Sequence, residues 1–262
     1  MSVDHGPRMG AHAQATANRK DGLVRTDLKT EYSALLARGH ALYPGVRIGR
    51  PGRSAWYWPT ITGMRLLRAK WRVVVDGSEL VAPGAAILIG NHVSMLDPVV
   101  AVMSHRWRIS AFTKVEAFEG AGGIFFRLMG QIPLRRGDEA ATSWAMDMAS
   151  FALACGCKIG LYPEGTRSPD RQLHRLHKRV MIPLIQANPD VPVHAISTRY
   201  GSKRGWRTTV EVRLSERLAI DPSSMTAQEI TDAVRDALLS LGGQTYVDRY
   251  AGDVKRELSK LP

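Results

Sequence analysis

Two side chains in the stretch NHVSMLDP, those of His92 and Asp97, are of the types that together form a general base. A carboxylate beside Nδ1 of an imidazole holds the proton on that nitrogen, leaves Nε2 free to accept another, and stabilises the imidazolium that forms. Neighbours on a helix face are three or four residues apart, so residues five apart meet only where the chain turns. A strand ending at Gly90, a loop, and a helix beginning near Asp97 would provide that turn. The alternative is structural, with the histidine capping the loop and the aspartate capping the helix.

Ser94 lies between these two residues and is the nucleophile that a serine hydrolase would use. The stretch has no G-x-S-x-G context, which is the strained turn that exposes a nucleophilic serine. We therefore expect His92 to activate an acceptor hydroxyl directly. A serine hydrolase stays an alternative, and it would form an acyl-enzyme that can be trapped.

Two further stretches carry arginines suited to binding an anion. The turn predicted for YPEGTRS contains, in order, Glu164, Gly165, Thr166 and Arg167. Its glycine permits a backbone angle that other residues resist. The second stretch, GQIPLRR, ends in Arg136 after a short predicted strand. A guanidinium binds phosphate or carboxylate through two parallel hydrogen bonds. The structural alternatives are an ion-paired turn and a solvated basic pair.

The stretch RQLHRLHKR, residues 171–179, places four cations and two histidines within nine residues. It predicts a strong positive field that could bind phosphate, anionic lipid or an acidic carrier protein. His174 and His177 are three residues apart, but no partnered carboxylate or third ligand is evident. We therefore expect no metal site.

The composition is that of a basic globular protein, because the chain of 262 residues has a net charge of +12 and a sequence pI near 10.1. A basic surface attracts nucleic acid, anionic lipid or an acidic protein. No nucleic-acid-binding motif is visible, so we expect no nucleic acid among the partners. Cys155 and Cys157 are too close for a good disulfide and too few for a zinc site. We expect small buried residues in a reducing cytosol.

The chain divides into three predicted parts. Residues 1–25 are polar, lack the apolar core of a secretory signal, and are expected to form a disordered tail. Residues 26–53 are expected to be a basic linker with a short helix that starts at Glu31 and ends near Gly39. Residues 54–262 are expected to form one folded domain. No run of about 18 apolar residues occurs, so no membrane-spanning helix is predicted.

The segment of residues 54–72 combines three tryptophans and a tyrosine with four basic residues. Aromatic rings beside cations suit a membrane interface, where the rings lie in lipid and the cations meet headgroups. A core helix with a basic face is an equally good interpretation of the same residues.

The periodicity of the remaining chain predicts alternating strands and helices. Strands are expected at residues 71–77, 84–90, 108–114, 131–134, 158–163, 191–197 and 208–216, and helices from residue 97 and at residues 123–130, 138–156, 177–188 and 226–243. This order predicts the α/β class, as a single domain with a mixed, largely parallel sheet flanked by helices. The loops 91–97 and 162–168 follow strands, and ligand sites in such sheets lie at strand ends.

Four stretches together resemble the motifs of the glycerolipid acyltransferase family. NHVSMLD is similar to its N-H-x-x-x-x-D signature, and YPEGTRS to its F-P-E-G-T-R-S block. GQIPLRR is similar to its G-x-I-F-I-x-R block, with Arg136 as the arginine, and VPVHAIS to its V-P-[IV]-[VI]-P block. All four occur in the family's order, and the resemblance spans about residues 55 to 215.

The resemblance implies transfer of a fatty acyl group from acyl-CoA or acyl carrier protein to the hydroxyl of a lysophospholipid such as 1-acylglycerol-3-phosphate. It assigns His92 as the base and Asp97 as its partner. It places Glu164, Gly165, Thr166 and Arg167 in the acceptor site, with Arg167 and Arg136 on the phosphate. No metal or organic cofactor is implied. The domain of residues 54–262 would then be an acyltransferase domain, cytoplasmic and peripheral on the inner face of the cell membrane, where it meets an anionic surface. A different acceptor, either a glycolipid or a specialised metabolite, and a catalytically idle lipid-binding module stay open.

Overall fold

The computed structural model describes residues 27–51, 55–64, 66, 70–104 and 107–260. The predicted disordered tail, residues 1–25, lies outside the described residues, as do residues 54, 65 and 67–69 of the aromatic and basic segment.

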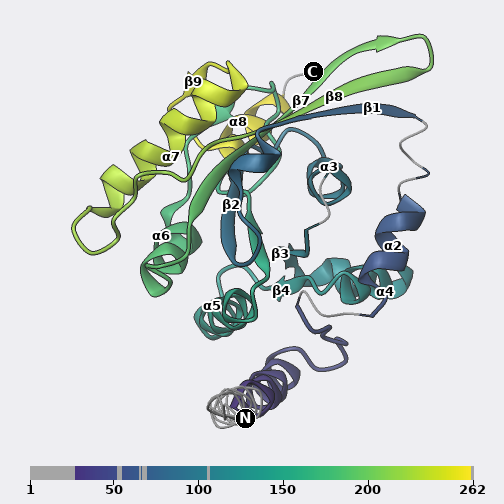
Figure 1. The fold of residues 1–262 in the computed structure, drawn as a ribbon, viewed down its shortest axis with the longest axis vertical. Coiled ribbons are helices and arrows are strands. Elements are labelled where there is room, and N and C mark those ends of the chain that lie inside the picture. Colours follow the sequence, from purple (N-terminus) through teal and green to yellow (C-terminus); the bar gives the residue numbers. More distant parts are fainter. Residues whose placement is uncertain (1–26, 52–54, 65, 67–69, 105–106, 261–262) are drawn as a thin grey trace, which may run out of the picture.

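Seven strands of the described chain form one sheet in the order β1-β8-β7-β2-β5-β3-β4 (Figure 1). They are β1 Trp71–Asp76, β2 Ala86–Gly90, β3 Ile109–Lys114, β4 Ile132–Leu134, β5 Lys158–Leu161, β7 Val193–Arg204 and β8 Arg207–Leu214. Neighbouring strands are parallel except for the antiparallel β7–β8 pair. The prediction of a single α/β fold with a mixed, largely parallel sheet is confirmed.

Helices cover both faces of the sheet (Figure 1). They are α2 Tyr57–Met64, α3 Asp97–Ser104, α4 Gly120–Leu128, α5 Glu139–Ala154, α6 Lys178–Ala187, α7 Ala227–Gly242 and α8 Ala251–Leu258, with short 3-10 helices at Ser78–Leu80 and Val115–Phe118. Helices α5, α6 and α7 pack on one face, together with Ile87 and Ile89 of β2. Helices α2 and α3 pack on the other, together with Leu88. Alternate residues of a strand point to opposite faces, so an all-apolar strand such as β2 serves two cores at once.

The two loops that carry the main sequence motifs begin at the same edge of the sheet. Strand β2 is parallel to β5, and Ile89 pairs with Leu161. The loop after Gly90 and the loop after Leu161 therefore start from adjacent strand ends. This register, rather than any sequence proximity, brings the two motifs together.

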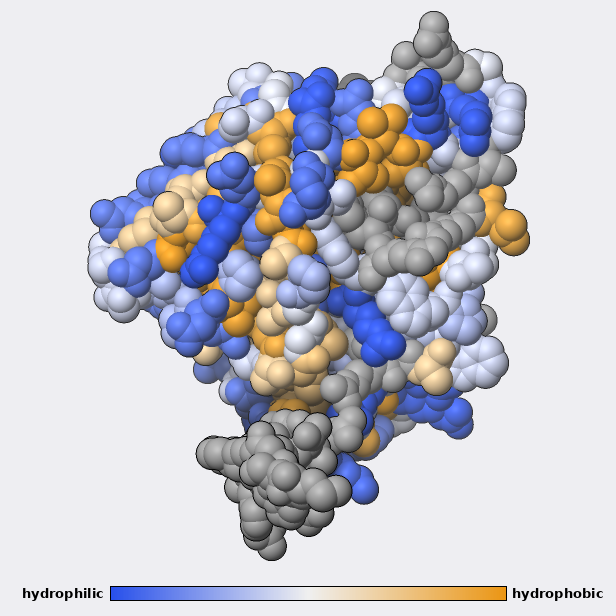
Figure 2. All heavy atoms as spheres, in the orientation of Figure 1, coloured by the Kyte–Doolittle hydropathy of each residue, from blue (hydrophilic) through white to orange (hydrophobic). Residues whose placement is uncertain are grey.

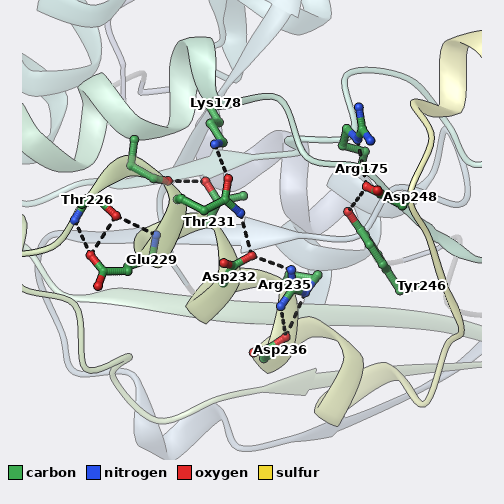
Figure 3. Close-up of polar contacts among 12 residues, drawn as sticks. Arg175, Lys178, Thr226, Glu229, Thr231, Asp232, Arg235, Asp236, Tyr246 and Asp248 are labelled. Atoms are coloured by element: carbon green, nitrogen blue, oxygen red, sulfur yellow. Dashed lines mark hydrogen bonds and ion pairs between the residues drawn. The ribbon is translucent and has the colours of Figure 1, made fainter.

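Helix caps confirm two of the predicted helix starts. The Asp138 side chain accepts a hydrogen bond from the Ala141 N–H at the start of α5. Thr226 and Glu229 form a reciprocal capping box at the start of α7 (Figure 3). Such caps satisfy backbone N–H groups that have no partner within the helix.

The predicted end of the first helix is wrong. The helix spans residues 27–42 and continues past Gly39, where a helix end was expected. A Cβ at Gly39 would lie 2.6 Å from atoms of both Ile48 and Trp144. The glycine therefore serves close packing, and the Trp144 indole N–H donates to the Leu35 carbonyl of the same helix at 2.7 Å.

The aromatic residues at 54–72 divide between core and surface. Tyr57 is buried, and its hydroxyl donates to the Trp107 carbonyl at 2.9 Å and accepts from the Ile109 N–H at 2.8 Å. Trp56 beside it is 62% exposed. The core interpretation holds for Tyr57, and Trp56 lies at the surface.

Three short elements have no counterpart in the sequence predictions. Strands β6 Leu173–His174 and β9 Tyr246–Val247 pair in parallel as a separate two-stranded sheet. Helix α8 follows β9 directly. Two-residue strands are too short to show a period, and α8 has only two turns and is mostly polar, so neither gives the periodic signal on which the predictions depend.

Candidate active site

The turn expected between His92 and Asp97 is present. Strand β2 ends at Gly90, α3 begins at Asp97, and the loop between them brings His92 Nδ1 to 2.9 Å from Asp97 Oδ2. The Asp97 side chain is fully buried, whereas one fifth of the His92 side chain is exposed. With Nδ1 engaged by the carboxylate, Nε2 is the ring nitrogen left to accept a proton.

Asp97 is fixed by four hydrogen-bonding groups. Its Oδ2 also accepts from the backbone N–H groups of Val93 and Ser94, at 2.7 and 2.8 Å. Its Oδ1 accepts from the Tyr200 hydroxyl at 2.9 Å. A buried carboxylate is costly without such donors. Tyr200 lies in β7, over one hundred positions along the chain, and nothing in the sequence patterns pointed to it.

Glu164 connects the two motif loops through backbone N–H groups. Its Oε1 accepts from the His92 N–H at 2.7 Å, and its Oε2 accepts from the His174 N–H at 3.2 Å. Burial raises the pKa of this carboxyl to about 7, and these two N–H donors oppose the rise. A further hydrogen bond joins the same two loops, because the Ser168 N–H donates to the His92 carbonyl at 2.7 Å. The turn that follows β5 therefore fixes the backbone of the histidine.

The Gly165 turn is shaped by close neighbours. Gly165 has a φ of 71°, and a Cβ there would lie 2.9 Å from the His177 ring. The Arg136 guanidinium donates to the Gly165 carbonyl, which joins the β4 end to this turn. Burial, followed by the charge of Arg136, lowers the pKa of His177. The glycine predicted from the turn pattern is thus required both by conformation and by space.

A cavity of about 1,140 Å³ lies against these loops. Its apolar lining comes mainly from β2, β3, α3 and α4 and includes Leu88, Val99, Val102, Ile109, Phe125 and Met129. Its polar lining comes from the motif loops and α8 and includes His92, Arg136, Glu164, Thr166, Arg167 and Lys255. Every site residue named from the sequence lines the cavity except Asp97, which lies behind His92. The cavity is lined by apolar side chains that suit an apolar chain, by cations that suit an anionic group, and by the imidazole of His92.

Asn91 holds the end of β2 in place and was not singled out from the sequence. Its Nδ2 donates to the Thr198 carbonyl at 3.1 Å and to Gln244 Oε1 at 3.0 Å, and its Oδ1 accepts from the Thr198 N–H at 2.8 Å. Asn91 is 1% exposed. Asn91 is the first residue of the N-H-x-x-x-x-D pattern, but its partners lie far away in the sequence.

Several side chains of the basic stretch, residues 171–179, contact other parts of the protein, and Arg179 lines the cavity. His174 is buried with Nε2 2.8 Å from Asp170 Oδ1, and His177 stacks on Tyr250 with ring centroids 4.2 Å apart. Arg175 pairs with Asp248 at 2.9 Å (Figure 3). Among the residues that the structure describes, no group of three or more His, Cys, Asp or Glu side chains is placed to hold a metal ion.

Residues 72–199 match the sequence model of the family described as Acyltransferase. This stretch, just under half of the chain, is similar to the acyltransferase family. The match includes both motif loops and Arg136, and it ends before α7, β9 and α8.

Two relatives extend the comparison. The chain is 27% identical to human 1-acyl-sn-glycerol-3-phosphate acyltransferase beta over 168 residues, which are 60% of this chain and 58% of that protein. The match thus spans less than two thirds of the human protein. The crystal structure of PlsC, the 1-acyl-sn-glycerophosphate acyltransferase of Thermotoga maritima, has the same fold with a TM-score of 0.56 and 20% identity. That superposition covers 79% of this chain and 81% of PlsC.

Proposed function

We propose that the protein is an O-acyltransferase that moves a fatty acyl group from a thioester, acyl-CoA or acyl carrier protein, to the hydroxyl of a lysophospholipid such as 1-acylglycerol-3-phosphate. The observation that carries the proposal is the His92–Asp97 contact of 2.9 Å beside a cavity with both apolar and cationic lining. The family match and the similarity to the human enzyme support it.

The geometry supports direct attack by the acceptor. Nε2 of His92 takes the proton of the acceptor hydroxyl as that oxygen bonds to the thioester carbonyl carbon. The tetrahedral intermediate collapses, the carbon–sulfur bond breaks, and the departing thiolate takes the proton back from His92. Asp97 stabilises the imidazolium between these two transfers. General base catalysis of this kind contributes about 10²–10⁴-fold to a rate.

Ser94 has a structural role that fits this direct route. Its hydroxyl oxygen accepts a hydrogen bond from the Leu96 N–H at 3.2 Å within the turn. Its N–H donates to Asp97 Oδ2. These contacts shape the turn that holds the base, and they support a route without a serine acyl-enzyme.

Acceptor recognition is assigned to the turn after β5 and the end of β4. Arg167 and Arg136 both line the cavity and would bind the phosphate. Thr166 offers a hydroxyl to the acceptor, and Gly165 allows the tight turn. Glu164 fixes the turn relative to His92 through its two backbone contacts. An acyl chain in the apolar part would gain about 0.8 kcal/mol per buried CH₂.

An anionic membrane surface on the cytoplasmic side is the proposed place of action. A net charge of +12 favours such a surface, with about 1 kcal/mol for each basic residue close to it. Figure 2 shows hydrophobic side chains reaching the surface between hydrophilic ones. The exposed apolar side chains include Met95, which lines the cavity, Ile124 of α4, and Trp56 and Leu66. Within the described ranges, no helix has the length and apolar content needed to cross a bilayer.

A product analysis tests the proposal. Purified protein is incubated with isotope-labelled acyl-CoA or acyl carrier protein and a panel of lysophospholipids, a glycolipid and a sterol, and the products are identified by mass spectrometry. We expect a labelled ester of a phosphate-bearing lysolipid. Hydrolysis of the thioester with no ester formed would favour a hydrolase, and binding of lysolipid without any turnover would favour an idle module. Either result would contradict the proposal.

A further inference from the structure

Helix α8 is fixed to the segment that follows the Gly165 turn. Strand β9, directly before α8, pairs with β6, and Leu173 is opposite Tyr246. The Tyr250 ring stacks on His177 with an interplanar angle of 3°. Figure 3 shows Asp248 held by Arg175 and Tyr246. These contacts fix the position of α8 relative to the Gly165 turn.

One face of α8 is turned toward the cavity. A Cβ at Gly252 would lie 3.9 Å from the Thr166 side chain, so the first turn of α8 approaches the Gly165 turn closely. Lys255 follows Gly252 by three residues and Ser259 follows Lys255 by four, which are the spacings of a single helix face. All three residues line the same cavity as Arg136 and Arg167.

The charges on α8 leave one cation free to act in the cavity. Asp253 pairs with Arg256 at 2.5 Å, and Glu257 pairs with Arg249. Lys255 makes no side-chain hydrogen bond or ion pair with any residue that the structure describes. Both carboxylates of the helix are thus neutralised by arginines, and Lys255 adds a net positive charge to the cavity wall.

We propose that Lys255 is a specificity-determining residue that binds the phosphate of the acceptor together with Arg136 and Arg167. The inference rests on the proposed function, and the residue lies outside the 72–199 stretch that the family model matches. A terminal phosphate carries nearly two negative charges and three acceptor oxygens, so cations from three separate elements can bind it together. An acceptor without phosphate would gain nothing from Lys255.

The test compares Lys255→Ala with Lys260→Ala. Lys260 carries the same charge two residues beyond α8 and does not line this cavity. Short-chain 1-acylglycerol-3-phosphate and the matching 1-acylglycerol serve as acceptors, with one labelled acyl thioester as donor. For Lys255→Ala we expect the KM of the phosphate-bearing acceptor to rise about tenfold or more, as for the loss of one charge-assisted hydrogen bond. The KM of the thioester, the kcat, and both constants for 1-acylglycerol should stay within about twofold, which is small beside such a loss.

Two further measurements keep the result decisive. Lys255→Arg should restore the KM to within a fewfold of wild type, because the positive charge returns. Calorimetric binding of the same short-chain phosphate acceptor should weaken in Lys255→Ala and not in Lys260→Ala, whether or not ester is formed. An unchanged affinity, or an equal loss for both acceptors, would overturn the assignment of Lys255. Absence of ester from wild-type protein that still binds the phosphate acceptor through Lys255 would overturn only the proposed transfer activity.

Discussion

Replacing Asp97 by asparagine removes a negative charge and keeps the size of the side chain. An amide oxygen can take the place of Oδ2, which accepts from the N–H groups of Val93 and Ser94 and lies 2.9 Å from His92 Nδ1. The amide NH₂ then faces the Tyr200 hydroxyl, which can accept as well as donate. We therefore expect Asp97→Asn to fold normally with His92 in its native position.

The loss of rate should come from the missing charge. During the reaction His92 becomes an imidazolium whose charge lies about 4 Å from that of the carboxylate, and two unit charges at that separation interact by about 4 kcal/mol at an effective dielectric constant of 20. Each 1.36 kcal/mol corresponds to about tenfold in rate. We expect kcat to fall about a thousandfold in Asp97→Asn.

The assay measures the initial rate of labelled ester formation at saturating thioester and acceptor, together with thermal melting. Tyr200→Phe is the matched control, because it removes a hydrogen bond to Asp97 and keeps the charge. Its kcat should stay within about tenfold of wild type, a smaller loss than that of a charge. An Asp97→Asn protein that melts like wild type and retains more than a tenth of its kcat would refute the reasoning.

Three other outcomes follow from the structure. Because burial raises the pKa of Glu164 to about 7, the folded protein keeps this proton at pH values where the unfolded chain has lost it, from its ordinary pKa of 4.5 upward. This stabilisation of the folded state is complete below pH 4.5 and is lost as pH rises through about 7. The free energy of urea unfolding of wild type, relative to that of Glu164→Gln, should therefore fall by about 3 kcal/mol between these two pH values. A difference between the two proteins that does not change with pH would contradict this. Gly39→Ala should destabilise the protein by about 1–3 kcal/mol through overpacking against Trp144, as measured by urea unfolding, whereas Gly63→Ala, with nothing within 4 Å of the new Cβ, should not; equal effects would show that packing is not the cause. Sedimentation with anionic vesicles should weaken as salt rises from about 0.1 to 1 M, where the screening length falls from about 10 to 3 Å; binding that salt leaves unchanged would argue against docking by charge.

The sequence was sufficient where the determinants of structure are local. The His92–Asp97 contact could be predicted because both residues lie in one loop between a strongly apolar strand and a helix, and the five-residue spacing requires a turn. The parallel sheet followed from the alternation of strands and helices. Neighbouring strand ends then placed Glu164 near His92.

Contacts between distant segments gave no comparable signal. Tyr200 reaches Asp97, and Gln244 reaches Asn91, only after the sheet and α7 have formed. The residue type was also misleading at Gly39. A glycine can end a helix or permit close packing, and the sequence alone does not distinguish the two. These positions depend on tertiary packing, which overrides local preference.

Two side chains of the basic stretch, residues 171–179, contact carboxylates that the sequence patterns did not indicate. His174 is buried beside Asp170, and Arg175 is paired with Asp248 from beyond α7. Lys255, which lines the cavity, lies on α8, a helix too short and polar to be predicted. A count of charges in a window therefore does not tell which of its cations face the cavity, as Arg179 does, and which are paired elsewhere, as Arg175 is.

The central claim is that His92 is the base that activates the acceptor hydroxyl, and its most direct test is the initial rate of ester formation by His92→Ala. His40→Ala, which changes an exposed histidine on the first helix, is the matched control. We expect His92→Ala to lose about a hundredfold or more in kcat, as for the loss of a general base, with thermal melting and lysolipid binding close to wild type, and His40→Ala to lose nothing. A folded His92→Ala protein that forms ester at the wild-type rate would contradict the account.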